Sequence, residues 1–367
     1  MTNNHNHTMT LQPISIATLV TLAIPTIIIQ LSFVVPPASA AAFVGRKYGA
    51  IYLDGYTLAW GTGNLLTMAP LQGVFNASDT LSPQAYGSGN YRQVGLIAMR
   101  AFAASMMVIL PINLLLVPWT ERLFDFLGQD AQAAMYAHQF YACYACSFPF
   151  YAFYSILWKF LACQNVMLPL VVSTCISVVV VLPFALEILS SCFAFYGVAM
   201  AFTIFYMVNS LLVLAWLYVW KPHHPHSWPA GGVLSVQTWR EALAWQRFRV
   251  FWSLCLGGML AYLEWCYWEC LTAMIGTMGV TELSAHSIPR QLSDLGYIGP
   301  NAIGLALAIR LGAMLAKDVR SAQRLALGTV LMGTLVFGAL SVVVHVFRDS
   351  LIGTNKTKKE TKKANKR

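Results

Sequence analysis

Charged residues are scarce in this sequence of 367 residues. Only 10% are Asp, Glu, Lys or Arg, whereas 57% are hydrophobic and the mean hydropathy is +0.60. Soluble domains carry roughly a quarter charged residues, so a water-soluble enzyme of this size is excluded. The same composition excludes collagen, disordered chains and secreted disulfide scaffolds. About 209 apolar positions suffice for about nine or ten membrane-spanning helices of roughly 20 residues each.

Motifs of nucleotide hydrolysis and of hydrolytic catalysis are also missing. The phosphate-binding pattern GxxxxGK followed by Ser or Thr, the nucleophile pattern GxSxG and the zinc pattern HExxH do not occur. Cys143 and Cys146 form a CxxC, but no second pair and no histidine at ligand spacing follows it, which favours a packing role for the eight cysteines. We therefore predict no enzyme activity, no cofactor and no metal site.

The net charge of +9 does not indicate a nucleic-acid partner. Seven of the 23 basic residues lie in the last twelve positions, Lys356 to Arg367. The others mostly fall between apolar segments, where basic residues orient membrane proteins. The distribution predicts the lipid bilayer as a partner and no nucleic acid.

Long apolar segments are what the chain has in abundance. None of them shows the alternation of a barrel strand, and a helix satisfies its backbone hydrogen bonds internally, as lipid requires. We therefore predict an all-α polytopic membrane protein. The apolar segments are 13–37, 51–78, 94–118, 131–158, 166–189, 194–219, 250–276, 283–311 and 325–347.

The charges of the loops predict the orientation of the chain. Residues 1–12 are polar and lack the basic region of a signal peptide, so we expect a cytoplasmic N-terminal tail. With that tail inside, the inner loops carry eleven basic residues and the outer loops four, as the positive-inside rule requires. Residues 348–367 are low in complexity and basic, and we expect a disordered tail there.

The longest connection, residues 220–249, divides the predicted helices into two groups. It is broken by prolines and holds three of the eight histidines, so a metal-binding tract is an alternative to a plain cytoplasmic linker. On the linker interpretation, residues 13–219 form an N-lobe of six transmembrane helices. Residues 250–347 form a partial C-lobe of about three, as in repeat transporters.

Ionisable residues within apolar spans are costly and mark functional candidates. Glu264 lies at the midpoint of segment 250–276, and Glu269 follows about 7.5 Å along the helix axis and about 140° around it. Burial favours the neutral form of a carboxyl group, so such a residue can take up and release a proton; the alternative is a hydrogen bond between helices. The neighbouring aromatics Trp265 and Trp268 could pack against flat or cationic ligands.

Other polar residues in the spans are open to two interpretations. Arg290 and Asp294, four residues apart, can form a structural ion pair within the membrane. Gln30 and Asn64 are lone amides deep in spans, and each either lines a polar cavity or bridges helices. Asp79 is expected to cap the turn that contains Gly87 and Gly89.

Four motifs resemble the multidrug and toxic compound extrusion (MATE) family, in its eukaryotic branch, between residues 13 and 330. The motifs come in the family's order and spacing. They are residues 79–95 (DTLSPQAYGSGNYRQVG), 157–165 (LWKFLACQN) with Pro169, 264–269 (EWCYWE) with Gly276 and 283–287 (LSAHS), and 310–312 (RLG).

The resemblance implies an antiporter in which protons or sodium enter as organic cations leave. Two six-helix lobes would alternate access to the substrate. Glu264 falls on the glutamate tied to proton coupling and Glu269 on the second glutamate of the motif, while Gln30 and Asn64 fall on cavity-lining positions. The first-helix aspartate of bacterial members is absent, because Gln30 occupies that region.

The chain also departs from the family pattern. The counterparts of helices ten to twelve are missing, which makes the sequence C-terminally short, and Gln291 stands where the family has a glutamate. Two alternatives to an exporter follow: a non-transporting membrane protein or subunit, and a flippase for lipid-linked sugars. The oligomeric state, including a homo-oligomer, and the membrane that holds the protein stay open.

Overall fold

A computed structural model describes residues 16–228, 232, 235–276, 280–315 and 318–351. Within these ranges the side chains of residues 16–22, 264, 272–273, 276, 280–295, 344 and 348–351 are outside the description. The described residues are helical and contain no strand, which confirms the all-α membrane fold class. The chain forms two compact units, Met1–Lys317 and Asp318–Arg367, and each is considered by itself.

Six apolar segments build the first part of unit one, and each was predicted from the sequence. α1 (Ile16–Lys47) continues ten residues beyond the predicted end, because the helix passes through Pro36 and Pro37 without ending. The remaining elements are α2 (Ala50–Thr62), η1 (Gly63–Met68), α3 (Ala69–Gly87), α4 (Tyr91–Phe126), α5 (Ala131–Tyr144), α6 (Ser147–Ala162), α7 (Leu168–Ile176), η2 (Ser177–Val181) and α8 (Leu182–Trp220).

Several of these segments are interrupted within the bilayer-length span. η1 and η2 are π-helical turns inside otherwise α-helical stretches. α8 contains two helices that meet at Ala194, whose φ of 50° and ψ of −131° break the helical path. The start of α5 is capped: Asp130 Oδ1 accepts hydrogen bonds from the backbone N–H groups of Gln132 and Ala133, at 2.9 and 3.0 Å.

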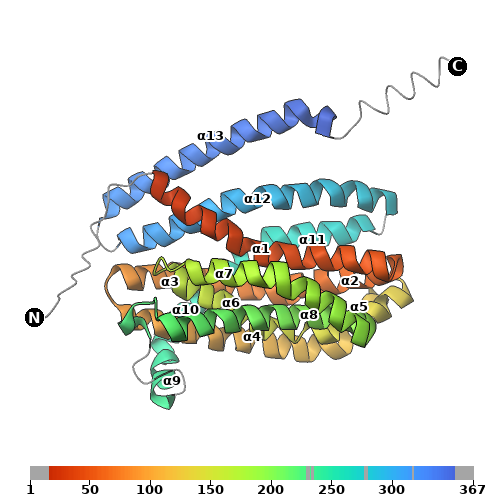
Figure 1. The fold of residues 1–367 in the computed structure, drawn as a ribbon, viewed down its shortest axis with the longest axis horizontal. Helices are drawn as coiled ribbons and strands as arrows, with labels where there is room; N and C mark the ends of the chain where they lie inside the picture. The colour runs from red at the N-terminus through yellow and green to blue at the C-terminus, as the bar shows by residue number, and fades with distance from the viewer. Residues whose placement is uncertain (1–15, 229–231, 233–234, 277–279, 316–317, 352–367) are drawn as a thin grey trace, which may run out of the picture. The chain divides into compact units, whose positions relative to one another are not determined.

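The predicted linker folds into two short helices, η3 (Pro225–Ser227) and α9 (Val236–Ala242). The chain continues into α10 (Trp245–Ala261), α11 (Leu263–Gly276) and α12 (Val280–Leu315). α10 and α11 together make the apolar segment predicted at 250–276, with a break at Tyr262, where bonds of the i to i+3 type replace the regular ladder. In Figure 1 the helices of unit one run side by side, and α9 extends from the end where α3 and α10 also lie.

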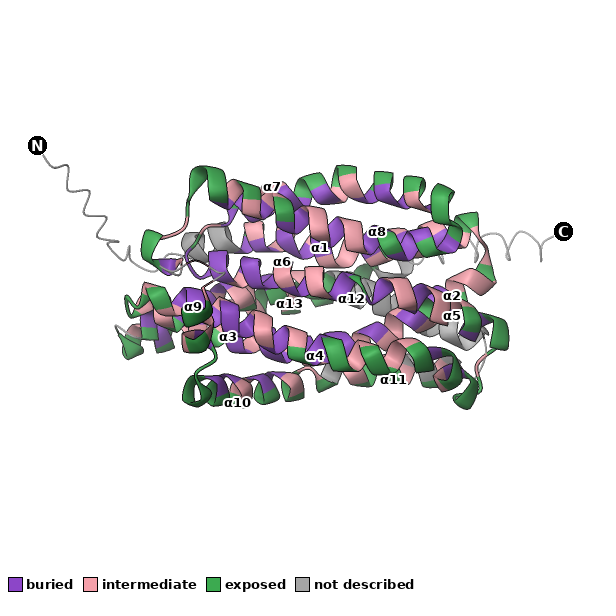
Figure 2. Ribbon diagram, turned by 90° about the horizontal axis from the view of Figure 1, so that it is seen from below, coloured by how far each residue is buried: buried purple, intermediate pink, exposed green. Residues whose placement is uncertain are grey.

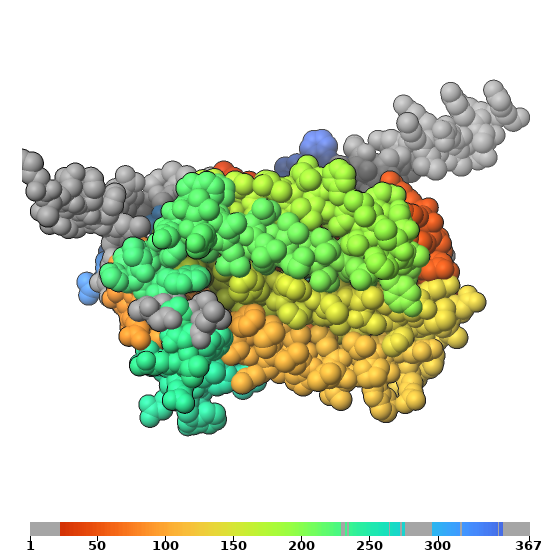
Figure 3. All heavy atoms as spheres, turned by 60° about the horizontal axis from the view of Figure 1, so that its bottom comes forward, coloured from red at the N-terminus to blue at the C-terminus, as the bar shows by residue number. Residues whose placement is uncertain are grey.

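We call that end of unit one the linker end, and the opposite end, where α1 meets α2 and α11 meets α12, the far end. Figure 2 shows buried residues on the inward faces of the helices and exposed residues on the outward faces. Aromatic rings fill the interior at the far end, and the Trp60 ring centroid lies 5.4 Å from Tyr144 and 5.6 Å from Phe202. Figure 3 shows the linker residues, in green to teal, beside the orange start of α4.

Unit two contains α13 (Val319–Leu351), the ninth predicted segment. Asp318 caps this helix, since its Oδ1 atom accepts a hydrogen bond from the backbone N–H of Arg320 at 3.0 Å. By length and composition, five stretches of the described residues are long and apolar enough to cross a membrane. They are Ala23–Lys47, Tyr91–Phe126, Leu168–Trp220, Gly296–Leu315 and Val319–Val343. The division of the chain into an N-lobe and a partial C-lobe stays a prediction.

Candidate functional site

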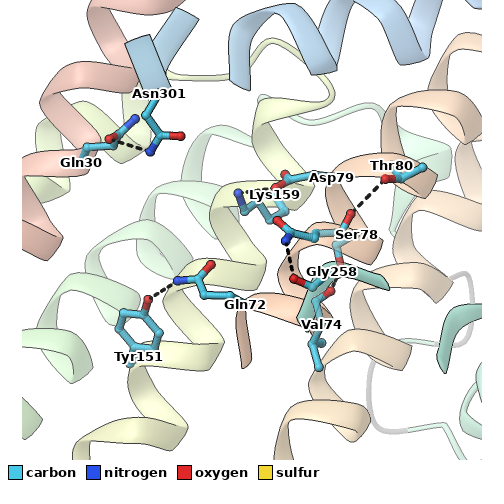
Figure 4. Close-up of polar contacts among 11 residues, drawn as sticks. Gln30, Gln72, Val74, Ser78, Asp79, Thr80, Tyr151, Lys159, Gly258 and Asn301 are labelled. Atoms are coloured by element: carbon cyan, nitrogen blue, oxygen red, sulfur yellow. Dashed lines mark hydrogen bonds and ion pairs between the residues drawn. The ribbon is translucent and has the colours of Figure 1, made fainter. Parts of the chain in front are cut away.

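Gln30 joins α1 to α12 near the middle of the bundle. Its side chain is 7% exposed, and its Oε1 atom accepts a hydrogen bond from Asn301 Nδ2 at 3.2 Å (Figure 4). The Nε2 group of Gln30 is buried without a hydrogen-bond partner among the described residues. Because leaving a buried donor unpaired costs about 1–3 kcal/mol, this amide has hydrogen-bonding capacity that the contacts of the fold do not use.

Three polar residues follow one face of α3, and we call them the α3 stripe: Gln72, Asn76 and Asp79. Their spacing of four and three residues places them within one side of the helix. Gln72 Nε2 donates to the Tyr151 hydroxyl of α6 at 3.3 Å (Figure 4). Asn76 Nδ2 donates to the Gly258 carbonyl of α10 at 3.3 Å. The stripe therefore connects α3 to α6 and to α10.

Asp79 does not cap the glycine turn, so that expectation is wrong. α3 continues through Pro83 to Gly87, which leaves Asp79 two turns inside the helix. Its Oδ2 atom instead pairs with Lys159 Nζ of α6 at 2.7 Å, and the Asp79 and Lys159 side chains are only 18% and 10% exposed. Lys159 Nζ also lies 4.4 Å from the ring centroid of Trp158. The pair lies well inside the bundle and neutralises both charges there.

We call two of these contacts the polar seam. In one, Gln30 of α1 bonds to Asn301 of α12; in the other, Asn76 of α3 bonds to the Gly258 carbonyl of α10. Around Asn76 the backbones of α3 and α10 approach so closely that side chains are excluded. A Cβ atom on Gly73 would lie 2.4 Å from Met259 Cγ and 2.5 Å from the Cys255 carbonyl oxygen. A Cβ on Gly258 would lie 2.8 Å from Asn76 Cβ. The seam is therefore closed by glycine contacts and neutral hydrogen bonds.

Asn64 lies in the π-helical turn η1, half-buried. Its carbonyl accepts the backbone N–H of Ala69, the i to i+5 bond that defines such a turn. π-helical turns occur frequently at functional sites, because the extra residue in the turn displaces neighbouring side chains. The sequence indicated the amide but gave no signal for the altered backbone around it.

α11 carries the remaining candidates, and the structure separates them. Glu269 is half-buried, with its Oε2 atom 4.0 Å from the position that a Cβ would take on Gly61 of α2. The Trp265 ring meets Tyr297 of α12 edge to face, with centroids 5.4 Å apart. Trp268 is 41% exposed and contacts Tyr267, which is 60% exposed. Trp265 thus lies against another helix, and Trp268 lies on the exposed face.

Three predicted residues lie where side chains are not described. Glu264 belongs to α11, and Arg290 and Asp294 belong to α12, but their side chains fall outside the described residues. Their roles stay predictions.

Four residues that were not predicted from the sequence make polar contacts between helices: Gln72, Asn76, Tyr151 and Asn301. A signal for three of them existed, because they are amides within apolar spans, the same feature that singled out Gln30 and Asn64. Tyr151 gave no such signal, because a tyrosine in an aromatic-rich span has the composition of ordinary core.

The fold and these contacts define an integral, multi-pass helical membrane protein with polar residues between two groups of helices. The sequence pattern of the MatE family matches residues 25–186 and 259–367. The chain therefore belongs to the MatE family of membrane transporters.

Sequence relatives point to the same family. The chain is 27% identical over 344 residues to multidrug and toxin extrusion protein 2 of Mus musculus, covering 90% of this chain and 58% of the relative. It is 26% identical over 334 residues to multidrug and toxin extrusion protein 1 of Homo sapiens, covering 90% of this chain and 56% of the relative. The chain thus spans little more than half the length of these curated relatives.

Solved structures show the same fold. The eukaryotic MATE transporter AtDTX14 is similar with a TM-score of 0.74 and 22% sequence identity, over 90% of this chain and 74% of that chain. A MATE structure in the bent conformation gives a TM-score of 0.72 at 16% identity, over 91% of this chain and 73% of that one.

Proposed function

We propose that the protein is a secondary antiporter that exports organic cations and other xenobiotics in exchange for protons. Its family and the names of its relatives, which are multidrug and toxin extrusion proteins, support this class of activity. The single observation that carries the proposal is the polar seam, with Gln30 and Asn301 at its centre.

The seam suits a contact that must open and close. A neutral hydrogen bond contributes only about 0.5–1.5 kcal/mol net, so the bonds of Gln30 and Asn76 can be exchanged for bonds to a ligand or to water at small cost. In repeat transporters one group of helices rocks against the other around a site near the bilayer midplane. α1 would move against α12 in this way, at the Gln30–Asn301 contact, while the close glycine contact keeps α3 and α10 together.

Cation binding is assigned to the residues around α11. Trp265 and Trp268 offer aromatic faces, which attract organic cations, and Gln30 and Asn64 offer amide groups to polar substituents. The Nε2 group of Gln30, which has no hydrogen-bond partner among the described residues, supports this assignment, because a ligand acceptor would satisfy it.

Proton coupling is assigned to Glu264 and Glu269. A carboxylate in contact with a cation keeps its charge, whereas an isolated carboxyl group in an apolar environment favours the protonated form. Proton and cation therefore compete for the same side chains, which is the requirement for exchange. The linker end, with its basic loops, faces the cytoplasm in this proposal, and Arg290 and Asp294 neutralise each other within α12.

Transport into proteoliposomes tests the proposal. An imposed pH gradient should drive uptake of a fluorescent organic cation, and Glu264→Gln and Glu269→Gln should each lower the initial rate at least tenfold. Glu187→Gln is the matched control, because that carboxylate is 66% exposed and pairs with Lys47 at the far end. Its uptake rate should equal that of the parent protein.

Four results would overturn parts of the proposal. Full uptake by Glu264→Gln and Glu269→Gln would exclude these residues as the coupling site. Uptake driven by a sodium gradient at constant pH, with none driven by a pH gradient, would make sodium the coupling ion in place of the proton. A folded protein with no flux under any gradient would favour a non-transporting subunit, and translocation of a fluorescent lipid-linked sugar in its place would favour a flippase.

A further inference from the structure

A pocket of about 690 Å³ opens at the linker end, away from the polar seam. α3, α4, α10 and the end of α12 line it. Its lining includes apolar residues, among them Leu81, Val250 and Leu315. It also includes amide and hydroxyl groups and two arginines, Arg100 and Arg247. Its volume lies within the range of small-molecule sites, roughly 300–1,000 Å³.

Arg100 has an incompletely satisfied guanidinium group. The residue is 1% exposed, and its Nε atom donates to the Ala242 carbonyl of α9 at 2.7 Å. Its Nη2 group is buried without a hydrogen-bond partner among the described residues. A buried cation needs hydrogen-bond acceptors or an opposite charge, and one carbonyl supplies neither the charge nor enough acceptors.

The surroundings of Arg100 carry an excess of positive charge. Arg247 Nη1 lies 3.8 Å from Glu241 Oε1, and the same carboxylate accepts a hydrogen bond from Arg92 at 2.5 Å. Arg92 and Arg247 thus share one carboxylate, whereas Arg100 pairs with no carboxylate among the described residues. The described residues therefore place three guanidinium groups near the pocket with one carboxylate paired to them.

We propose that this pocket binds a phosphate group, with Arg100 and Arg247 as its guanidinium donors. Phosphate oxygens match the planar fork of arginine, and Arg100 with its free Nη2 group supplies a donor on α4 while Arg247 supplies one on α10. The ligand bridges α4 and α10 at the linker end.

The apolar lining residues favour the headgroup of an anionic phospholipid as the source of the phosphate. Leu81, Val250 and Leu315 can contact the glycerol and acyl carbons, which inorganic phosphate lacks. Trp245, the first residue of α10, is 74% exposed, and exposed tryptophans mark the level of lipid headgroups. Free phosphate shares the polar part of this chemistry, so the experiment separates the two sources.

Ligand titration of the purified full chain in detergent tests the site, with the melting temperature as the readout. The probes are dioctanoylphosphatidylglycerol, dioctanoylglycerol, which lacks the phosphate, and inorganic phosphate. Phosphatidylglycerol should stabilise the protein with an apparent Kd at least tenfold lower than that of dioctanoylglycerol. Added salt should weaken its binding, because part of the site is exposed to screening.

Variants assign the binding to the two arginines. Arg247→Gln and Arg100→Gln should each weaken phosphatidylglycerol binding at least fivefold. Arg249→Gln, an exposed arginine two residues beyond Arg247 and outside the pocket lining, should leave it unchanged. Arg247 is exposed, so its variant tests the site even where Arg100→Gln fails to fold.

The outcomes decide whether the pocket binds a phosphate group and whether that group belongs to a lipid. If inorganic phosphate competes with phosphatidylglycerol in the parent protein but not in Arg247→Gln, the site is supported and takes soluble phosphate as well as lipid. Absence of such competition, with phosphatidylglycerol binding intact, would support the lipid headgroup alone. Equal binding of dioctanoylglycerol and phosphatidylglycerol, or equal losses in Arg247→Gln and Arg249→Gln, would overturn the proposal.

Discussion

α10 and α11 are two halves of one apolar segment, yet they pack very differently. α10 buries Phe248, Phe251, Cys255 and Gly258. α11 has no buried residue among those of its side chains that the structure describes, and Leu263 and Met274 are 56% and 68% exposed. Both halves are rich in large apolar and aromatic residues, so hydrophobicity does not explain the difference.

The difference lies in the surface that each half meets. α10 meets α3 where Gly73 faces Gly258, and two backbones without Cβ atoms can approach closely and gain dispersion contacts, the main attraction between helices in lipid. α11 packs against α12, and toward α2 a Cβ on Gly61 would still lie 4.0 Å from Glu269 Oε2. The linker-end half is therefore tightly closed, whereas the half that carries the glutamates is loosely packed.

The largest expected effect concerns the ion pair on the α3 stripe, next to the closed half. Lys159→Met leaves the carboxylate of Asp79 buried and unpaired, which should cost about 3–5 kcal/mol of unfolding free energy. Adding Asp79→Asn should recover most of this loss, because the double variant contains no charge to bury. Unfolding titrations of the parent, the single variant and the double variant measure these free energies. Equal stability of the single and the double variant would contradict the pairing of Asp79 with Lys159.

The comparison between the two halves predicts opposite responses to one added methyl group. Gly73→Ala places a carbon against the Cys255 carbonyl, which cannot move aside, so the unfolding free energy should fall by about 1–3 kcal/mol. Gly61→Ala has room and gains helix propensity, so it should be neutral or slightly stabilising. Melting temperatures of the two variants provide the measurement, and a similar loss in both would mean that α11 packs as tightly as α10.

Neighbouring glycines of α10 test which face of the helix makes the contact. Gly258→Ala would meet Asn76 and should destabilise the protein by about 1 kcal/mol. Gly257→Ala meets no atom within 4 Å and should stabilise it by about 0.5–1 kcal/mol. The order of melting temperatures should be Gly257→Ala, then parent, then Gly258→Ala. A reversed order would contradict the contact of the Gly258 face of α10 with α3.

The smallest expected effect concerns the linker that precedes α10. Its His224 ring stacks on Tyr91 with centroids 3.7 Å apart, and its backbone N–H donates to Gln164 at 2.9 Å. Burial, together with the neighbouring His226, lowers the pKa of His224 below its ordinary value of 6.5. The unfolded chain then binds more protons between the two pKa values, so stability should fall as the pH drops through and below about 6.5.

Melting temperatures between pH 7.5 and 5 measure this dependence. The phenyl ring of His224→Phe keeps the stacking on Tyr91 and cannot be protonated. The melting temperature of this variant should therefore change less between pH 7.5 and 5 than that of the parent, and the difference should be at most about 2 °C. An unchanged pH profile in this variant would remove His224 as the titrating group.

The helices could be predicted from the sequence, because the requirement for internal hydrogen bonds in lipid turns each apolar run into a helix. Their interruptions could not. η1, η2 and the break at Tyr262 depend on packing between segments, and no local residue pattern marks them.

The polar contacts were predictable only in part. A buried amide indicates that a partner exists but does not name it, so Gln30 was found and Asn301 was not. Asp79 was assigned to the wrong partner because the continuation of α3 through Pro83 carried it away from the turn. Lys159, eighty residues away in sequence, could be paired with it only from the tertiary structure.

The break at Tyr262 has a mechanical consequence. The regular ladder of hydrogen bonds is already interrupted between α10 and α11, so bending at this point requires little further loss of bonding. α11, which is fourteen residues long, can tilt while α10 stays packed against α3. A change in the depth of Glu269 relative to the bilayer then needs no displacement of a whole lobe.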